Sequence, residues 1–509
     1  MGFDIETGTW RGAVTGAALT TAVIVLAVVL RTLGRFLRRE WMLRSVPGVP
    51  GCNWALGHVV QLTTCVRKHV AAWDQILDWV DTCPGPLVKF RILGTHCVAF
   101  SDPAGMKRVF QSAYKIYEKD LALSYAPFLP ILGTGLVTAD GDQWQKQRTL
   151  MGPALRIDVL DDIIYIAKKA VDRMCGKLEP YRGKSIPVDV NEEFRLTTLQ
   201  VIGEAMLSMS PEECDKVFPS LYLPVMEEAN LRVLHPYRKY IPSRAWFQFN
   251  DRMAKLNTFL IDFFRTRWAD RKAGRRQGRK DILDRILDSI VAAGTPWSTQ
   301  LETQLCYETK TFLLAGHETS AAMLTWSLYE LSQNAGHMDK VLDEAKKVFG
   351  SKEAEPARRE VDGMTYTLAV LKEALRKYSV VPVVTRVLAK DDVLLGHKVP
   401  AGTMISCMLQ GTHHRYKNPK TFDPERYMPG GEYDQFDEAT RTFMFLPFIQ
   451  GPRNCLGQHL ALLEARVVLS LLVKRFKWRP ANGAPLGWSL RSPTVIPIAP
   501  EGGLNMYID

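Results

Sequence analysis

The chain has 509 residues, of which 46% are hydrophobic and 23% are charged, and its formal net charge is +11. This composition excludes a disordered, collagen-like or low-complexity chain, and the length allows a deep hydrophobic core. The nine cysteines are scattered singly without a C-x-x-C pair, which argues against a disulfide framework or structural zinc site and favours a reducing environment.

The N-terminal region contains an uncharged run of 18 residues, AVTGAALTTAVIVLAVVL at 13–30. This run is just long enough to cross a bilayer as a helix. Asp4 and Glu6 precede it, and five arginines follow it: Arg31, Arg35, Arg38, Arg39 and Arg44. A basic flank on the C-terminal side predicts a signal anchor whose following domain lies in the cytoplasm, whereas a cleaved signal peptide would have a basic front and a shorter apolar core.

The anchor and its basic flank are expected to occupy residues 1–45. A stiff hinge, VPGVPG, follows at 46–51, and one folded body is expected over 46–509. Helical periodicity dominates this body, as at 161–178, 281–294 and 308–333. Strand-like segments are short and broken by Gly or Pro, at 85–102, 391–409 and 494–508. The sequence therefore predicts a mainly α fold with small β sheets.

Part of the positive charge lies in RWADRKAGRRQGRK at 267–280, between two helical patterns. Runs of like charge repel one another and are usually solvated. A nucleic-acid surface would also need interleaved aromatic residues and a binding motif, and neither follows in the sequence. We therefore expect a solvated loop and no nucleic-acid partner.

Three short patterns along the body combine polar residues with helical spacing. Trp144 and Arg148 in DGDQWQKQR lie one helical turn apart. The sequence AGHETS at 315–320 interrupts an apolar helix with weak helix formers, which predicts a kink. Glu373 and Arg376 have i, i+3 spacing, so their side chains can meet. Taken alone, such patterns are more often polar patches or exposed ion pairs than functional sites.

The sequence FIQGPRNCLG places Cys455 between a stiff polar turn and a long helical pattern. A lone cysteine is usually a small core residue, but a helix N-terminus stabilises a thiolate. Gly451 allows a tight turn, and Gly457 leaves space for a flat group near the backbone. Phe448 offers an aromatic wall and Arg453 a fork for carboxylates. Together they predict a thiolate beneath a planar dicarboxylate cofactor, which is haem.

This segment resembles the haem-binding signature F-x-x-G-x-R-x-C-x-G of the cytochrome P450, or haem-thiolate monooxygenase, family, in its eukaryotic membrane-anchored (microsomal) form. The likeness extends from the anchor to the C-terminus, with the landmarks in the family's order. It implies a cytochrome P450 catalytic domain over 46–509, with haem b between the oxygen-activating helix and the Cys-ligand loop. Cys455 would be the axial ligand of the haem iron, and Arg453 would contact a haem propionate.

The resemblance also gives roles to the other patterns. Thr319 and Glu318 would steer protons during O2 activation, Ala315 and Gly316 would leave room for O2 and substrate, and His317 is assigned no role. Three further residues would contact the propionates: Trp144, Arg148 and, from PVVTR, Arg386. A buried structural lock would consist of Glu373, Arg376 and, from FDPERY, Arg426.

Four segments rich in apolar and aromatic residues are expected to line the substrate pocket: 112–136, 218–241, 381–384 and 493–496. They predict a lipophilic substrate such as a fatty acid, sterol or terpenoid. The sequence departs from the family where KYSVVPVV has Ser379 and Val380 in place of two frequent prolines. We expect this change to reshape substrate access and to leave haem binding intact.

The sequence contains no convincing dinucleotide-binding or flavin-binding unit. Electrons would therefore come from an NADPH-dependent flavoprotein reductase in the same membrane, expected to be the endoplasmic reticulum, with cytochrome b5 as a second candidate partner. Lys146, Lys474 and Arg475 are expected near the thiolate, where they could meet an acidic reductase surface.

Three functions are compatible with a haem-thiolate site. An O2-using monooxygenase, performing hydroxylation or epoxidation, is favoured because AGHET is complete. An isomerase or lyase that acts on a peroxide or another substrate without O2 would not need this proton-delivery motif. A non-catalytic haem-binding protein or sensor would not need Thr319 either.

Overall fold

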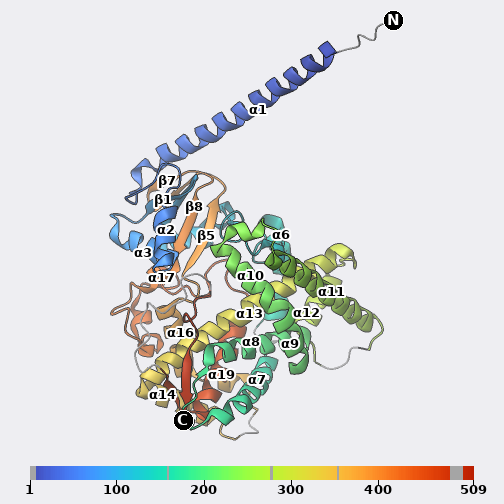
Figure 1. Ribbon diagram of the computed structural model, residues 1–509. Helices are drawn as coiled ribbons and strands as arrows, with labels where there is room; N and C mark the ends of the chain where they lie inside the picture. Colours follow the sequence, from blue (N-terminus) through green and yellow to red (C-terminus); the bar gives the residue numbers. More distant parts are fainter. Residues whose placement is uncertain (1–6, 157–159, 276–278, 352–354, 482–496) are drawn as a thin grey trace.

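The computed structural model describes residues 7–156, 160–275, 279–351, 355–481 and 497–509. α1 (Thr7–Met42) extends away from the folded body, and the C-terminus lies at the opposite end of the molecule (Figure 1). The stretch Leu19–Ser45 has a mean hydropathy of 1.7 in its most apolar window, none of which is buried. Its length and composition fit the predicted membrane anchor. Asp4 and Glu6 lie outside the described residues.

The C-terminal turns of α1 are docked on the body. The rings of Phe36 and His96 lie 4.7 Å apart, and Glu40 Oε2 lies 2.9 Å from His96 Nε2. Arg39 Nε donates a hydrogen bond of 3.0 Å to the carbonyl oxygen of Ala401. These contacts fix the direction in which the helix leaves the body.

The predicted hinge at 46–51 is held against the first strand of the body. Val49 N donates to Lys89 O at 3.0 Å, and Lys89 N donates to Pro47 O at 2.8 Å. Val46 and Val49 are both buried. The segment is therefore a paired extended connection rather than a free linker.

The strands form small sheets, as predicted. The largest has the order β1 (Val88–Ile92), β2 (Thr95–Phe100), β8 (Met404–Met408), β5 (Val383–Leu388) and β3 (Tyr117–Glu118). Only the β2–β8 pairing in this sheet is parallel. A three-stranded sheet contains β4 (Val188–Asp189), β10 (Asn505–Ile508) and β9 (Trp478–Pro480), and a hairpin contains β6 (Asp392–Leu394) and β7 (His397–Val399).

A long central helix, α13 (Thr299–Gln333), organises the α-helical part. It packs against α8 (Val190–Leu207), α16 (Thr365–Tyr378) and α19 (Gln458–Arg475), and α7 (Asp162–Leu178) packs on α8 and α19 (Figure 1). Ser298 caps α13 by accepting a hydrogen bond from Leu301 N at 3.2 Å. The helix is continuous through AGHETS, so the predicted kink does not break it.

The remaining helices pack around this centre or beside the largest sheet. They are α2 (Val59–Arg67), α3 (Ala72–Thr82), α4 (Pro103–Lys107), α5 (Leu129–Leu132), α6 (Gly141–Met151), α9 (Pro211–Val217), α10 (Leu223–Leu234), α11 (Arg244–Lys272), α12 (Ile282–Ala292), α14 (Ala335–Val348), α15 (Arg358–Asp362), α17 (Leu409–His413) and α18 (Glu438–Arg441).

The basic segment at 267–280 is only partly the solvated loop that the sequence predicts. Its first residues continue α11 to Lys272. Arg267 is buried, and its Nη1 lies 2.6 Å from Asp281 Oδ2 and 3.1 Å from Asp284 Oδ1. The prediction was wrong for Arg267 because a charge run in sequence does not reveal acids on the next helix that can neutralise one of its members.

Candidate active site

The Cys455 loop is a tight turn that ends just before α19. Cys455 N donates to Phe448 O at 2.8 Å, and Asn454 N donates to Gly451 O at 3.0 Å. Gly451 has a φ of 81°, and a Cβ there would collide with the carbonyl oxygen of Phe110. Glycine is therefore required at this position by both conformation and space.

Cys455 is exposed. Burial raises the pKa of the thiol, whereas hydrogen bonds from the Gly457 and Gln458 backbone and the charge of Arg148 act in the opposite direction. A Cβ on Gly457 would meet no protein atom within 4 Å. The thiol thus lies beside open space and receives the donors that stabilise a thiolate.

The predicted propionate-binding residues gather beside this loop. Arg148 donates to Asn454 O at 2.8 Å and to Asn454 Oδ1 at 2.6 Å. The Arg453 guanidinium lies 4.4 Å from the ring centroid of Trp144. Arg386 is buried and donates to Thr385 O at 2.7 Å. Arg148 therefore holds the Cys455 loop directly, while its contact with a propionate stays a prediction.

Buried positive charge in this cluster exceeds the negative charge that the described residues supply. Arg386 Nη2 and Arg453 Nε are buried without a hydrogen-bond partner in the described part of the chain. Asp140 Oδ1 lies 2.6 Å from Arg453 Nη2. Burial lowers the pKa of Lys119 well below its usual value, and the charges of Arg386 and Arg453 lower it further. Orphaned guanidinium nitrogens are what a dicarboxylate cofactor such as haem would satisfy.

Lys119 and Asp140 were missed by the sequence reasoning. Lys119 N donates to Asp140 Oδ2 at 2.7 Å, which joins β3 to the residue before α6. Neither residue belongs to a recognisable motif. A signal for Asp140 could have been its place four residues before Trp144, but nothing in the sequence marks Lys119.

The AGHETS segment, for which a role in oxygen activation is predicted, occupies an otherwise buried part of α13. Ala315 is exposed and Thr319 is half-buried, one helical turn apart. Thr319 Oγ1 donates to Ala315 O at 2.7 Å. A Cβ on Gly316 would lie 2.8 Å from Ile202 Cγ1 of α8. Gly316 thus allows two helices to pack closely, while its expected role in leaving room for O2 or substrate stays a prediction.

Glu318 lies on the buried side of the same helix. Its Oε1 is 3.7 Å from Arg195 Nη2 of α8 and 3.7 Å from His317 Nε2. Arg195 in turn contacts Glu192 at 2.6 Å, and both side chains are partly exposed. Burial raises the pKa of Glu318, which the charge of Arg195 opposes. This arrangement links a buried acid to the surface through a single arginine.

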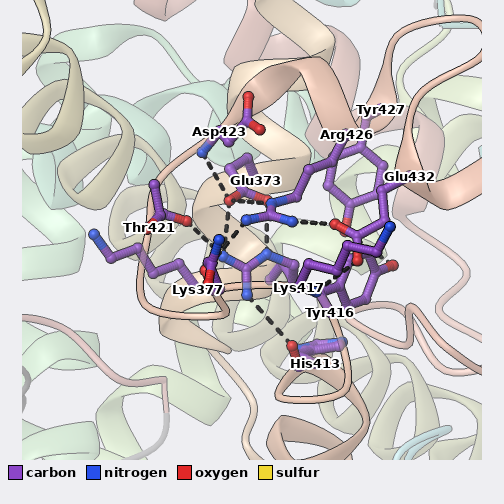
Figure 2. A network of polar contacts seen from close by, with 12 residues as sticks. Glu373, Lys377, His413, Tyr416, Lys417, Thr421, Asp423, Arg426, Tyr427 and Glu432 are labelled. Carbon is purple, nitrogen blue, oxygen red and sulfur yellow. Dashed lines mark hydrogen bonds and ion pairs between the residues drawn. The ribbon is translucent and has the colours of Figure 1, made fainter.

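The predicted structural lock is assembled from α16 and the 3₁₀ turn Pro424–Tyr427 (Figure 2). Arg376 Nε and Nη2 donate to the two carboxylate oxygens of Glu373 at 2.7 and 2.8 Å. Arg426 Nε lies 3.4 Å from Glu373 Oε1, and Asp423 N donates to the same oxygen at 2.9 Å. Both members of the central pair are fully buried.

The expected reductase-facing cations do not all lie near the thiolate. Lys474 and Arg475 end the 18-residue α19, whose N-terminus follows Cys455; at 1.5 Å per residue they are roughly 27 Å away. Lys474 Nζ already contacts Phe349 O, and Arg475 Nη2 lies 3.0 Å from Glu179 Oε2. Lys474 and Arg475 are not close to Cys455, because they lie at the far end of the helix that begins beside it, and a reductase contact at either residue stays a prediction. Lys146 is exposed on α6, which also carries Arg148.

The departure at Ser379 and Val380 is internal to the fold. Ser379 ends α16 in the left-handed conformation, with a φ of 42°. Its hydroxyl lies 2.7 Å from His413 Nδ1, and Val380 is buried with its carbonyl accepting from Ile498 N at 2.9 Å. The expected pocket segment at 493–496 lies outside the described residues. Ser379 therefore closes a helix rather than presenting its side chain to a substrate.

A mainly α fold with a cysteine loop at the start of α19, which packs on the central helix α13, is the arrangement expected of a haem-thiolate protein. Comparison with known proteins agrees: the sequence model of the family described as Cytochrome P450 matches residues 47–500. The chain belongs to the cytochrome P450 family. It is a cytochrome P450 monooxygenase, and the family binds haem b and uses O2 with electrons from NADPH.

Several relatives match almost the whole chain. Cytochrome P450 4c21 of Blattella germanica is 26% identical, covering 91% of this chain and 93% of the relative. Cytochrome P450 4A11 of Homo sapiens is 27% identical, covering 96% and 92%. The crystal structure of the cytochrome P450DA heme domain superposes with a TM-score of 0.76 at 21% identity, covering 91% of this chain and 97% of that one. These findings confirm the predicted family and fold.

Proposed function

We propose that this chain hydroxylates or epoxidises a lipophilic small molecule, with Cys455 as the axial ligand of the haem iron. The observation that carries this proposal is the pairing of an accessible thiol with orphaned cations. The thiol of Cys455 receives backbone donors at the start of α19, and Arg386 and Arg453 have buried nitrogens available for carboxylates. When bound, haem supplies the O2 activation that no amino-acid side chain provides.

The residues of α13 would then control protons. Burial raises the pKa of Glu318, so this acid keeps its proton to a higher pH than a free glutamic acid. Thr319 donates its own proton to Ala315 O, which leaves its oxygen lone pairs to accept a hydrogen bond from water. Glu318 would receive protons from the surface past Arg195 and Glu192, and Thr319 would orient the water that carries them onward.

A lipophilic substrate is supported by the expected pocket segments. Within 112–136, Leu121 and Leu123 are exposed apolar side chains, and within 218–241 Tyr240 and Ile241 are exposed as well. Accessible apolar side chains on such segments suit a ligand that partitions into membranes. Fatty acids, sterols and terpenoids share this property, and α1 would keep the enzyme at the membrane that holds them.

The electron donor would be an NADPH–cytochrome P450 reductase in the same membrane, with cytochrome b5 as a second donor. We place both in the endoplasmic reticulum membrane, with the catalytic domain in the cytosol. The arginine-rich end of the α1 region supports that orientation. Lys146, exposed on the helix that holds the Cys455 loop, supports an acidic partner surface there.

Thr319→Ala in the full-length protein with reductase tests the monooxygenase assignment. We expect haem content to be unchanged and product per NADPH consumed to fall about tenfold, because proton control contributes on the order of 10²-fold or more to such reactions. Thr311→Ala is the matched control, since Thr311 on the same helix also donates to a carbonyl oxygen one turn back, at 2.8 Å. Unchanged product per NADPH in Thr319→Ala would refute the role of Thr319 in O2 chemistry.

A further inference from the structure

His317 is a buried histidine beside the proposed proton-delivering acid, and no role follows from the sequence. Its side chain is fully buried. His317 Nδ1 lies 2.7 Å from the carbonyl oxygen of Leu313. A carbonyl oxygen can only accept, so Nδ1 carries the hydrogen. His317 Nε2 is buried and has no hydrogen-bond partner among the described residues.

The chemistry of His317 Nε2 follows from this tautomer. Burial lowers the pKa of His317 to about 3, so the ring is neutral at physiological pH and Nε2 has a lone pair. A lone pair attracts hydrogen-bond donors and repels an ionised carboxylate. The ring therefore favours a neighbour that carries a proton.

Glu318 lies between two side chains that stabilise opposite protonation states of its carboxyl group. Its Oε1 is 3.7 Å from His317 Nε2 and 3.7 Å from Arg195 Nη2. Arg195 is always charged and attracts the ionised carboxylate, whereas His317 Nε2 can accept a hydrogen bond only from the protonated carboxyl group. Neither distance is that of a hydrogen bond, so the carboxyl group is not fixed to either side.

We propose that His317 is a positioning residue that holds the protonated form of Glu318, while Arg195 holds its ionised form. Glu318 then changes partner each time it gains or loses a proton. The use of this exchange in O2 chemistry rests on the proposed proton-delivery role of Glu318. The exchange of partners itself does not depend on that role.

The groups that face Glu318 belong to three elements. α8 supplies Arg195 and Glu192, and the charge of Glu192 raises the pKa of Glu318 while that of Arg195 lowers it. The π-helical turn Phe218–Tyr222 supplies Tyr222, whose ring centroid lies 5.6 Å from that of His317. Tyr222 Oη is buried without a partner among the described residues, so it is a competing donor for His317 Nε2. The negative charge of Glu227 on α10 raises the pKa of Arg195.

Infrared spectroscopy of the full-length holoprotein tests the exchange, because a buried protonated carboxyl group has a separate carbonyl band. Subtracting the spectrum of Glu318→Gln assigns the band, and its loss with rising pH gives the titration midpoint of Glu318. We expect His317→Phe to lower the midpoint by about one pH unit, since the acceptor for the protonated form is lost. Arg195→Met should raise it, since the ionised form loses its cation.

Two variants serve as controls. His317→Gln keeps an acceptor that can reach the position of Nε2, and the midpoint should return toward that of the parent. Tyr222→Phe removes only the hydroxyl group that competes for His317 Nε2, so the midpoint should stay unchanged or rise. The proposal is overturned if His317→Phe leaves or raises the midpoint, if Tyr222→Phe lowers it equally, or if no band disappears in Glu318→Gln.

The same variants separate this inference from the proposed function. Product per NADPH should fall several-fold in His317→Phe above the lowered midpoint, and it should recover below that midpoint. If the infrared midpoints shift as expected but Glu318→Gln leaves product per NADPH unchanged, the exchange stands and the proton-delivery role of Glu318 fails.

Discussion

Two buried glutamates of this enzyme each lie beside an arginine, and they differ in how firmly they are held. Glu373 receives two hydrogen bonds of 2.7 and 2.8 Å from Arg376 and a third from a backbone amide. Glu318 has its closest ionic partner, Arg195, at 3.7 Å. Burial raises the pKa of both acids, so burial alone does not distinguish them.

The difference lies in hydrogen-bond satisfaction. A buried ion pair held by several hydrogen bonds is rigid and costly to break, so Glu373 is suited to holding α16 against the segment that contains Asp423. A buried acid with distant partners can gain or lose a proton without breaking the structure. The same pair of residue types thus serves as a fixed structural element in α16 and, in the role proposed for Glu318, as a proton carrier in α13.

The largest effect is expected for Glu373→Gln. Removing the charge leaves Arg376 buried and uncompensated, which should cost about 3–5 kcal/mol and prevent recovery of folded, haem-containing protein. The control is Glu425→Gln, which breaks an exposed pair with Lys340 and should cost at most about 1 kcal/mol. Haem content per protein and soluble yield are measured for both variants. Normal haem content in Glu373→Gln would show that the lock is dispensable.

A smaller effect is expected for Glu318→Gln, and it should be confined to activity. The variant keeps the size of the side chain and removes its proton exchange, so product per NADPH should fall about tenfold while haem content is unchanged. Haem analysis and NADPH coupling measured on the same sample would distinguish this outcome. A parallel loss of haem would mean that Glu318, like Glu373, mainly supports the fold.

The smallest effect concerns a third buried acid, Glu308 of α13. It accepts hydrogen bonds from Leu136 N at 3.0 Å and Gln304 Nε2 at 2.7 Å, and the described residues give it no ion-pair partner. Burial raises its pKa to about 7. Between the usual pKa of about 4.5 and 7 the folded state binds a proton that the unfolded chain releases, so the free energy of unfolding falls as pH rises through this window.

Thermal unfolding at pH 5 and pH 8 measures the contribution of Glu308 to the free energy of unfolding. The parent should lose on the order of 1–3 kcal/mol from Glu308 between these pH values, seen as a decrease of a few degrees in the unfolding midpoint. Glu308→Gln should lose less unfolding free energy over the same change in pH. An identical pH dependence in both proteins would show that ionisation of Glu308 does not change the free energy of unfolding.

The sequence predicted those parts of the site that depend on short spacing. Cys455 and Gly451 lie within one turn, and Glu373 and Arg376 lie within one helical turn, so local geometry brings each pair together. The apolar N-terminal helix and the mainly α class also follow from periodicity and length. Arg426 and Arg386 were found only through family resemblance, because each is distant in sequence from the residues it accompanies.

The remaining features depend on contacts between distant elements. Gly316 faces Ile202 of α8, a contact that no motif encodes. Lys119 joins the cation cluster through β3 pairing, and Lys474 lies one helix length from Cys455. Such positions are set by helix packing and strand register, which single-sequence patterns do not specify.

The most direct test of the account is the visible spectrum of the reduced, carbon-monoxide-bound protein, recorded for the parent and for Cys455→His. We predict a long-wavelength Soret band in the parent that is absent from the variant, because only a thiolate opposite the bound gas produces it. A short-wavelength band in the parent, or a long-wavelength band that persists in Cys455→His, would contradict ligation of the haem iron by the Cys455 thiolate.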